Sequence, residues 1–227
     1  MSKAWTIAKI NFRQIKTAYF ITGMVLLTMA ANYLLGVFLP HTEDNTTVSM
    51  GNMLILLVIL AAVFIPAANL RKMMNLGAGR NDFYWGCIPV YVLLSAAVTL
   101  AILLFHGTVD RLMRSHVHGI LDVIEVFGFV SRGPVVAFVQ LFSLLLLVAS
   151  FTHTLTVMQN AWYGWAADTL LIAVISVFTP IAPLRALEAR FFNLIIFGNP
   201  ALQVMSCLIL AAAFYALSRP ALHRKKR

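Results

Sequence analysis

The stretch Pro134–Thr156 reads PVVAFVQLFSLLLLVASFTHTLT, and it decides the fold class. It contains no lysine, arginine, aspartate or glutamate, and it is longer than the about 20 apolar residues with which a helix crosses a bilayer. Five further stretches of comparable length and character lie around it. The sequence therefore predicts an all-α, polytopic membrane protein with six transmembrane helices, at Ala18–Leu39, Met53–Leu70, Trp85–Phe105, Pro134–Thr156, Trp162–Ile181 and Pro200–Leu217.

The composition of the whole chain excludes a soluble fold. Of 227 residues, 61% are hydrophobic and 11% are charged, whereas soluble domains have about 45–50% apolar and about 25% charged residues. The two cysteines, Cys87 and Cys207, lie in apolar runs and give neither a disulfide framework nor a CxxC metal pattern. The apolar run after Lys16 is too long for a signal peptide, so we expect a retained first helix.

The net charge of +9 is explained by topology, because lysine and arginine are retained on the cytoplasmic side of a membrane. With six spans and a cytoplasmic N-terminus, twelve of the 17 basic residues fall inside: Lys3, Lys9, Arg13, Lys16, Arg71, Lys72, Arg80, Arg219, Arg224, Lys225, Lys226 and Arg227. The sequence thus predicts that both termini are cytoplasmic, and it disfavours nucleic-acid binding.

Five segments outside the spans have a character of their own. Residues 1–17 mix basic and apolar side chains and predict an N-terminal interfacial helix, with a simple basic tether as the alternative. The transmembrane domain covers residues 18–218. Within it, the sequence of residues 107–133 predicts an external amphipathic helix or helix pair, and that of residues 181–200 predicts a re-entrant or interfacial hairpin. Residues 219–227 form a basic cytoplasmic tail.

The fifth segment, residues 69–86, joins spans two and three on the cytoplasmic side and reads NLRKMMNLGAGRNDFYWG. A basic start, an apolar patch and two glycines predict a short amphipathic helix followed by a break. Neither this segment nor any other matches the phosphate-binding pattern GxxxxGK[ST], so the chain has no recognisable ATPase of its own.

These features together resemble the short six-helix permeases of bacterial ABC exporters, the type-2 class. The resemblance covers nearly the whole chain, through the basic N-terminal helix, the RKMMNLGAGRND stretch, the proline-interrupted segment ending at Gly198-Asn-Pro200 and the basic tail. It implies a multi-pass protein of the bacterial plasma membrane that partners a separate ABC ATPase subunit and a second permease copy or paralogue. Within the family, the chain looks most like exporters of amphipathic peptides, such as phenol-soluble modulins, bacteriocins or lantibiotics.

The resemblance also implies a division of labour. ATP and magnesium would bind the partner subunit and no cofactor would bind this chain directly. The stretch 69–86 would correspond to the family's coupling helix, whose residues here are Arg71, Lys72, Met73, Met74, Leu76, Arg80 and Asp82.

Polar residues inside the spans are candidates for a transport path, because ionisable groups in a membrane seldom face lipid. Asn32 and Gln140 are the larger amides in otherwise apolar spans, and His153 and Asp168 lie at similar depth on neighbouring spans. A His153–Asp168 pair would stabilise the bundle or relay protons. The alternative is that Asp168 packs near the inner interface beside tryptophan and tyrosine residues.

No metal site or enzyme is expected. His106, His116 and His118 invite a zinc interpretation, but no cysteine or glutamate completes a four-ligand set nearby, which favours solvated interfacial histidines. The patterns GxSxG and HExxH do not occur. The sequence therefore predicts a permease subunit of an exporter, with a stand-alone secondary transporter or a membrane immunity or scaffold protein as the alternative.

Overall fold

The computed structural model describes residues 3–38, 46–114, 119–159, 162–178 and 180–224. In these ranges the chain is helical apart from short turns and one small sheet, in which β1 (Thr46–Val48) and β2 (Gly119–Leu121) pair in parallel. The helical elements are α1 (Lys3–Gln14), α2 (Lys16–Phe38), α3 (Met50–Met53), α4 (Ile55–Phe64), η1 (Ile65–Asn69), α5 (Leu70–Asn75), α6 (Arg80–Phe105), η2 (His106–Asp110), α7 (Arg111–Met113), α8 (Val123–Val126), η3 (Val130–Arg132), α9 (Pro134–Met158), α10 (Trp162–Phe178), α11 (Ala182–Phe192), η4 (Asn193–Phe197) and α12 (Pro200–Arg224).

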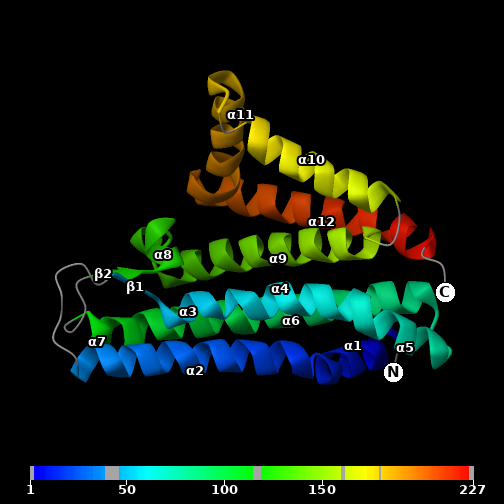
Figure 1. Cartoon of the computed structure of the whole chain (residues 1–227), viewed down its shortest axis with the longest axis horizontal. Helices are drawn as coiled ribbons and strands as arrows, with labels where there is room; N and C mark the ends of the chain where they lie inside the picture. The colour runs from blue at the N-terminus through cyan, green and yellow to red at the C-terminus, as the bar shows by residue number, and fades with distance from the viewer. Residues whose placement is uncertain (1–2, 39–45, 115–118, 160–161, 179, 225–227) are drawn as a thin grey trace.

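Five stretches of helix within the described residues are long and apolar enough to cross a membrane. They are Lys16–Leu35, Met50–Asn75, Arg80–Met113, Pro134–Met158 and Pro200–Leu222. Their axes run along the long dimension of the molecule (Figure 1). The all-α membrane fold is therefore confirmed.

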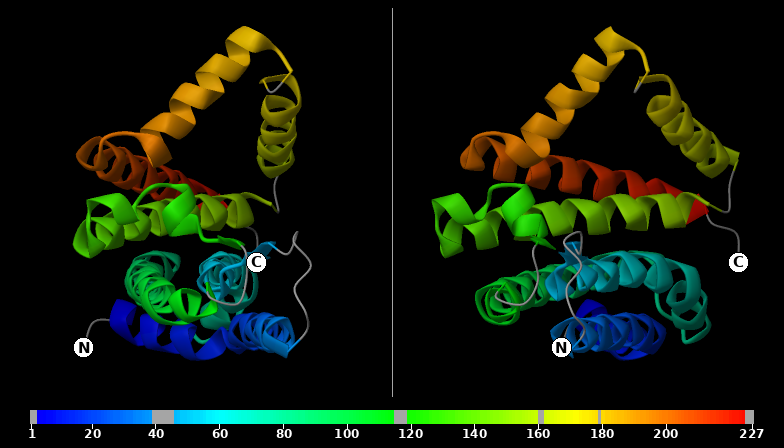
Figure 2. Two further views of the ribbon diagram at one scale, coloured as in Figure 1. Left: turned by 90° about the vertical axis from the view of Figure 1, so that its left-hand side faces the viewer. Right: turned by 60° about the vertical axis from the view of Figure 1, so that its left-hand side comes forward.

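The two ends of the bundle differ. The N-terminal helix α1, α5, the start of α6 and the end of α12 lie together at one end, which we call the α5 end (Figure 1). The sheet, α7 and α8 lie at the opposite end, the α8 end. Helices α9 and α12 both run from the α8 end to the α5 end, so the intervening α10 and α11 carry the chain back (Figures 1 and 2).

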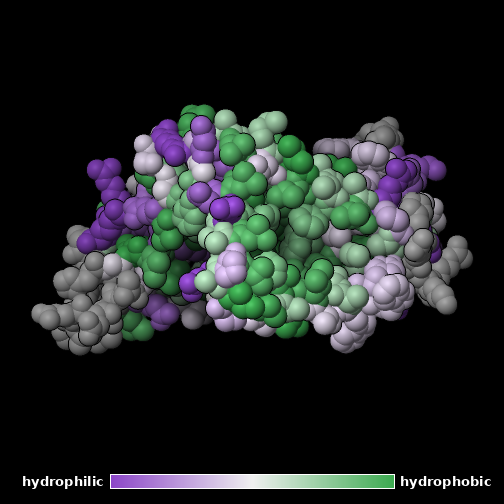
Figure 3. Space-filling model, turned by 90° about the horizontal axis from the view of Figure 1, so that it is seen from above, coloured by the Kyte–Doolittle hydropathy of each residue, from purple (hydrophilic) through white to green (hydrophobic). Residues whose placement is uncertain are grey.

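The outer surface is suited to lipid. Phe20 on α2 is 69% exposed and Leu170 on α10 is 65% exposed, and many large apolar side chains share this character. Seen from the side of α10, α11 and α12, hydrophobic residues cover the middle of the face and hydrophilic ones lie mainly toward its ends (Figure 3). Such an extended apolar surface marks contact with a membrane.

The core lies where α4, α6, α9 and α12 pack together. Ala61 and Ala62 on α4 are fully buried, and small residues let membrane helices approach closely. Leu141 and Leu145, one helical turn apart on α9, are buried in the same cluster. The α10–α11 pair lies outside this core, and its residues contribute little to it.

Four predicted spans are longer in the structure, and the second and the third differ most. The second continues beyond Leu70 through α5, after a π-helical turn at Ile65–Asn69 that contains Pro66. Proline removes a backbone hydrogen bond, which is a common cause of such a local change in helix geometry. The third begins at Arg80 rather than Trp85 and continues through η2 to Met113.

The segment 107–133, which was predicted to be external, differs from the predicted amphipathic helix or helix pair. The long third helix extends into it, and after residues 115–118, which lie outside the described residues, come the strand β2 and the short turns α8 and η3. Gly128 and Gly133 have positive φ angles of 69° and 94°, a conformation that ends helices. The helical spacing of the apolar residues in this segment did not indicate where the helices end.

The fifth predicted span, Trp162–Ile181, also needs correction. Helix α10 ends at Phe178, and the helix formed by α11 and η4 meets it at 115°, so the two together form a broken span or a re-entrant loop. Pro183 in the first turn of α11 accounts for the new start, because proline suits that position. The segment 181–200 is thus mainly helical.

Candidate functional site

The α5 end carries the residues that were predicted to contact an ATPase. Leu70 and Met73 of α5 are buried, whereas Arg71 and Lys72 are exposed, and Leu76 just after the helix is 74% exposed. Three further predicted residues, Met74, Arg80 and Asp82, are partly buried. Helix α5 therefore exposes a basic face with the apolar Leu76 next to it, while its other face packs against the bundle.

Local sequence explains why the helix is short. Backbone N–H groups of Leu76 and Gly77 close the last turn of α5, and Gly77 then adopts a positive φ of 80°, which only glycine takes up readily. Helix α6 begins at Arg80, with Asp82 in its first turn, where a carboxylate interacts favourably with the helix dipole. The turn between α5 and α6 is thus tightly defined.

Helix α1 is fastened to the same end. It crosses the bundle axis in the end-on view (Figure 2, left) and packs against α6. The Nδ2 of Asn69 donates to Oδ1 of Asn11 at 3.3 Å, and the Nδ2 of Asn11 lies 3.8 Å from the Cys87 sulfur. All three side chains are buried, so a polar node joins α1, the start of α5 and α6.

Helix α12 is tied to the start of α6 by a reciprocal pair of tyrosines. The Tyr215 hydroxyl donates to the Tyr84 carbonyl at 2.6 Å, and the Tyr84 hydroxyl donates to the Tyr215 carbonyl at 3.2 Å. The Arg219 guanidinium lies 5.9 Å from the centre of the Tyr84 ring and donates to Asn81. Residues next to the α5–α6 turn therefore connect directly to the last helix.

A hollow of about 350 Å³, lined in part by these two tyrosines, lies between α6, α9 and α12. Its lining is mainly apolar, with hydroxyl groups contributed by three tyrosines and a serine: Tyr84, Ile88, Tyr91, Val92, Leu146, Ser150, Leu208, Ala211, Ala212 and Tyr215. Tyr91 also lies 2.7 Å from Nδ1 of His153, which is fully buried. The hollow suits an apolar chain that carries occasional polar groups.

The structure gives His153 and Asp168 different partners. His153 is buried against Tyr91 and Tyr215, whereas Oδ2 of Asp168 accepts a hydrogen bond of 2.7 Å from Gln159. Gln159 follows the end of α9 and Asp168 lies in the second turn of α10, so the acid is close to the α5 end. This placement favours the interpretation of Asp168 as an interface residue.

The two predicted amides also differ. Asn32 is exposed on the outer side of α2. Gln140 is buried on α9, and its Nε2 donates to Oε1 of Gln203 on α12 at 2.6 Å. The structure leaves Gln140 Oε1 and Gln203 Nε2 buried without a hydrogen-bond partner among the described residues. Each of the two amides therefore has one polar atom that is hydrogen-bonded and one that is not.

Sequence reasoning missed the tyrosines of the hollow. Tyr84 and Tyr91 are seven residues apart, about two helical turns, and so lie on one face of α6. The seven-residue spacing could therefore have indicated that the two tyrosines share one face of a helix. The contribution of Tyr215 was not visible, because it depends on the packing of α12 against α6.

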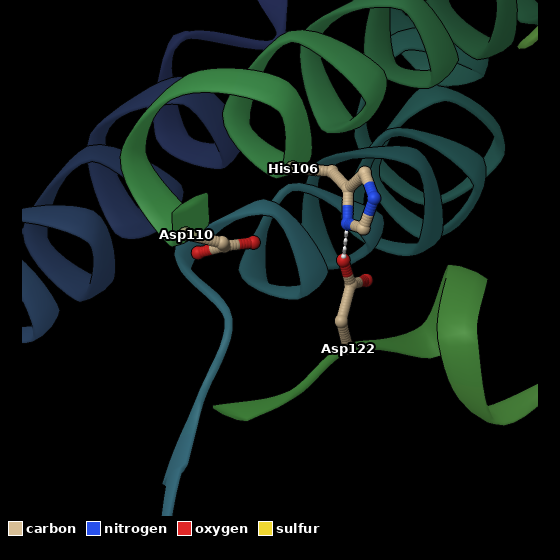
Figure 4. A group of neighbouring side chains, drawn as sticks. All are labelled: His106, Asp110 and Asp122. Atoms are coloured by element: carbon tan, nitrogen blue, oxygen red, sulfur yellow. Dashed lines mark hydrogen bonds and ion pairs between the residues drawn. The ribbon is translucent and has the colours of Figure 1, made fainter. Parts of the chain in front are cut away.

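A second polar cluster lies at the α8 end. Nδ1 of His106 and Oδ2 of Asp122 are 2.6 Å apart, and Asp110 lies beside them (Figure 4). Ligand atoms of these three residues all lie within 4.8 Å of one another. Both aspartates are fully buried, and the imidazole is 19% exposed.

The surroundings of this cluster hold it in place. The Ser49 hydroxyl donates to Oδ2 of Asp110 at 2.6 Å, and Oδ1 of Asp122 accepts the Ile124 N–H at the start of α8. Arg114 hydrogen bonds to Glu125, and this bond raises the pKa of Arg114 above its ordinary value. His106 was predicted to be a solvated interfacial residue, but its imidazole is mostly buried and contacts the Asp122 carboxylate. His116 and His118 lie outside the described residues.

Comparison with protein-family models, with curated proteins and with solved structures finds no match for this chain. What the protein does must therefore be inferred from its own residues.

Proposed function

We propose that this chain is the membrane-spanning permease subunit of an ABC-type exporter. The observation that carries the proposal is α5, a short helix at one end of the bundle with a buried apolar face and an exposed basic face. An exposed element of this kind between two membrane-crossing helices is suited to receive a soluble partner. Because the chain lacks a phosphate-binding loop, ATP and magnesium would bind on that partner.

The connections of α5 support a mechanical role. Through Asn69 and Asn11, α5 is linked to α1, and through the Tyr84–Tyr215 pair the start of α6 is linked to α12. A displacement of α5 would therefore be transmitted to helices that line the hollow. Packed helices transmit such shifts because close-packed interiors deform little.

The distribution of charge supports an orientation with the α5 end in the cytoplasm of a bacterial cell. Basic residues lie on α1, on α5 and near the end of α12, while Asp110, Asp122 and Glu125 lie at the α8 end. Retention of lysine and arginine on the inner side would give this orientation. The bent α10–α11 pair would then be the fifth crossing in chain order and bring the total to six, because α9 ends at the α5 end and α12 begins at the other.

An amphipathic peptide is the substrate class that fits the hollow best. Its walls are mostly apolar and its hydroxyl groups come from Tyr84, Tyr91 and Tyr215, which can bind occasional polar groups. The unsatisfied amide atoms of Gln140 and Gln203, which lie nearer the starts of α9 and α12 than the hollow does, could bind backbone groups. In the exporter, this chain would pair with a second copy or a paralogue to enclose the path.

The test begins with the reading frames adjacent to this one, where the proposal expects a P-loop ATPase. That ATPase is co-expressed with the full chain, and the complex is purified in detergent. We expect Arg71→Glu to weaken the association by more than about tenfold, because charge reversal on the exposed face of α5 opposes docking. Leu76→Ala should weaken it less, through lost apolar contact.

The matched control is Arg111→Glu, a reversal of an exposed basic residue at the α8 end. It should leave ATPase association unchanged. The proposal is wrong if no neighbouring frame encodes such an ATPase, or if Arg71→Glu and Arg111→Glu bind the ATPase equally well.

A further inference from the structure

We propose that His106, Asp110 and Asp122 form a binding site for a divalent transition-metal cation at the α8 end. The site is separate from α5 and does not depend on ATPase docking. It joins a helix turn to a segment more than ten residues farther along the chain, which is why sequence spacing did not indicate it.

The donor set fits such a cation. One imidazole nitrogen and two carboxylate oxygens are ligands that zinc and neighbouring first-row metals use in proteins, with further positions open to water. His106 and Asp110 are four residues apart, so both project from one face of η2. Asp122 approaches from the other side, on the turn that begins α8 (Figure 4).

Burial and charge provide an independent argument. Asp110 and Asp122 are both fully buried, and Oδ1 of Asp110 has no hydrogen-bond partner among the described residues. Figure 4 shows the Asp110 carboxylate turned toward the His106–Asp122 pair. Buried carboxylates are expensive unless they are paired or coordinate a metal, and the imidazole is hydrogen-bonded to only one of the two, Asp122. A divalent cation supplies positive charge within the cluster and a partner for the orphaned oxygen.

The geometry needs only a small adjustment to accept the ion. Zinc binds nitrogen and oxygen ligands at about 2.0–2.2 Å, which places tetrahedral ligand atoms a little over 3 Å apart. The ligand atoms here lie within 4.8 Å of one another, and the His106–Asp122 contact of 2.6 Å would lengthen slightly. The two carboxylates are already oriented by hydrogen bonds, because the Ser49 hydroxyl donates to Asp110 and the Ile124 N–H donates to Asp122.

The bound cation would fasten the external ends of several segments. Ser49 precedes α3, His106 and Asp110 end the third long helix, and Asp122 begins α8. Asn52 already bridges the same parts, accepting from the Val123 N–H and donating to the Leu121 carbonyl. The cation would therefore act as a structural clamp on this end of the bundle.

The test uses the purified full chain in detergent, titrated with zinc, manganese or calcium ions in competition with a fluorescent chelator. We expect one zinc ion per chain to remain after desalting, and zinc to bind more tightly than calcium because of the imidazole ligand. Asp110→Asn and Asp122→Asn keep the side-chain shape and an acceptor oxygen, and each should weaken zinc binding by more than about tenfold. Zinc should also raise the unfolding temperature of the wild type and not of these variants.

Glu125→Gln is the matched control, because Glu125 is an exposed acid on the same turn and lies outside the cluster. It should retain zinc affinity and the thermal shift, and so should His116→Gln/His118→Gln. Gel filtration and circular dichroism establish that each variant is folded. The inference fails if the wild type retains no zinc, or if folded Asp110→Asn and Asp122→Asn bind it as tightly as Glu125→Gln does.

Discussion

Gln140 and Gln203 illustrate how a single pair of residues can serve stability or transport. Each is buried, and one hydrogen bond between them leaves one amide atom of each without a partner. A buried amide that loses its partner is destabilising, whereas replacing both members with apolar residues of similar size can be nearly neutral. The two roles can therefore be separated by substitution.

We predict that Gln140→Leu and Gln203→Leu are each destabilising, and that the double variant regains part of the lost stability. The coupling free energy should be about 0.6–1.7 kcal/mol, which spans the average and the largest values measured for hydrogen bonds between the helices of a membrane protein. Denaturant unfolding in mixed micelles provides the four values of the double-mutant cycle. Strictly additive effects would contradict the prediction, because the two side chains are in direct contact.

If the amides also bind a transported peptide, the double variant should fold and yet transport poorly. Comparing its peptide export with its unfolding free energy separates the two functions. Gln159→Leu, an exposed amide at the end of α9, is the control for a general effect of losing an amide.

At the scale of elements, the approach of α1 to α6 depends on one glycine. A Cβ atom at Gly86 would lie 2.8 Å from Cγ2 of Ile7 and 3.0 Å from the Ala4 carbonyl oxygen. Cβ atoms essentially never approach another heavy atom closer than 3.0 Å, so Ile7 or the backbone of one helix would have to move. Gly86 thus permits the close packing that fixes α1 across the α5 end.

We predict that Gly86→Ala lowers the unfolding free energy by about 1–3 kcal/mol, the usual effect of overpacking a close contact. The N-terminal helix should also become more accessible to protease. Gly23→Ala is the control, because a Cβ there meets nothing within 4 Å. That variant should be as stable as the wild type or slightly more so, since alanine favours helix. Equal stability of the two variants would mean that α1 does not pack on α6 in this way.

The long helices could be predicted from sequence because a membrane requires every backbone polar group to be satisfied within the segment. Hydropathy alone therefore located the stretch Pro134–Thr156 within two residues of α9. The cluster of His106 with Asp122 could not be predicted, because it depends on how the chain folds back through β2. The pairing of Gln140 with Gln203 likewise depends on which faces of α9 and α12 meet.

At the scale of the whole molecule, the parallel course of α9 and α12 has a topological consequence. A chain that finishes α9 at the α5 end and starts α12 at the α8 end must return in between. Only α10 and α11, bent by 115°, are available for this return. If the bundle lies across a membrane as its apolar surface indicates, the pair crosses it in two inclined pieces.

We predict from this course that Lys72 and Arg219 face one compartment and Glu125 faces the other. Single cysteines at these positions, in a Cys87→Ala/Cys207→Ala background, are treated in intact cells with a maleimide that does not cross membranes. Glu125→Cys should react in intact cells, whereas Lys72→Cys and Arg219→Cys should react only after permeabilisation. A re-entrant α10–α11 pair would instead place Arg219 on the same side as Glu125. Because the native cysteines are both buried, they should react little with the maleimide, and their removal makes the labelling specific to the introduced thiols.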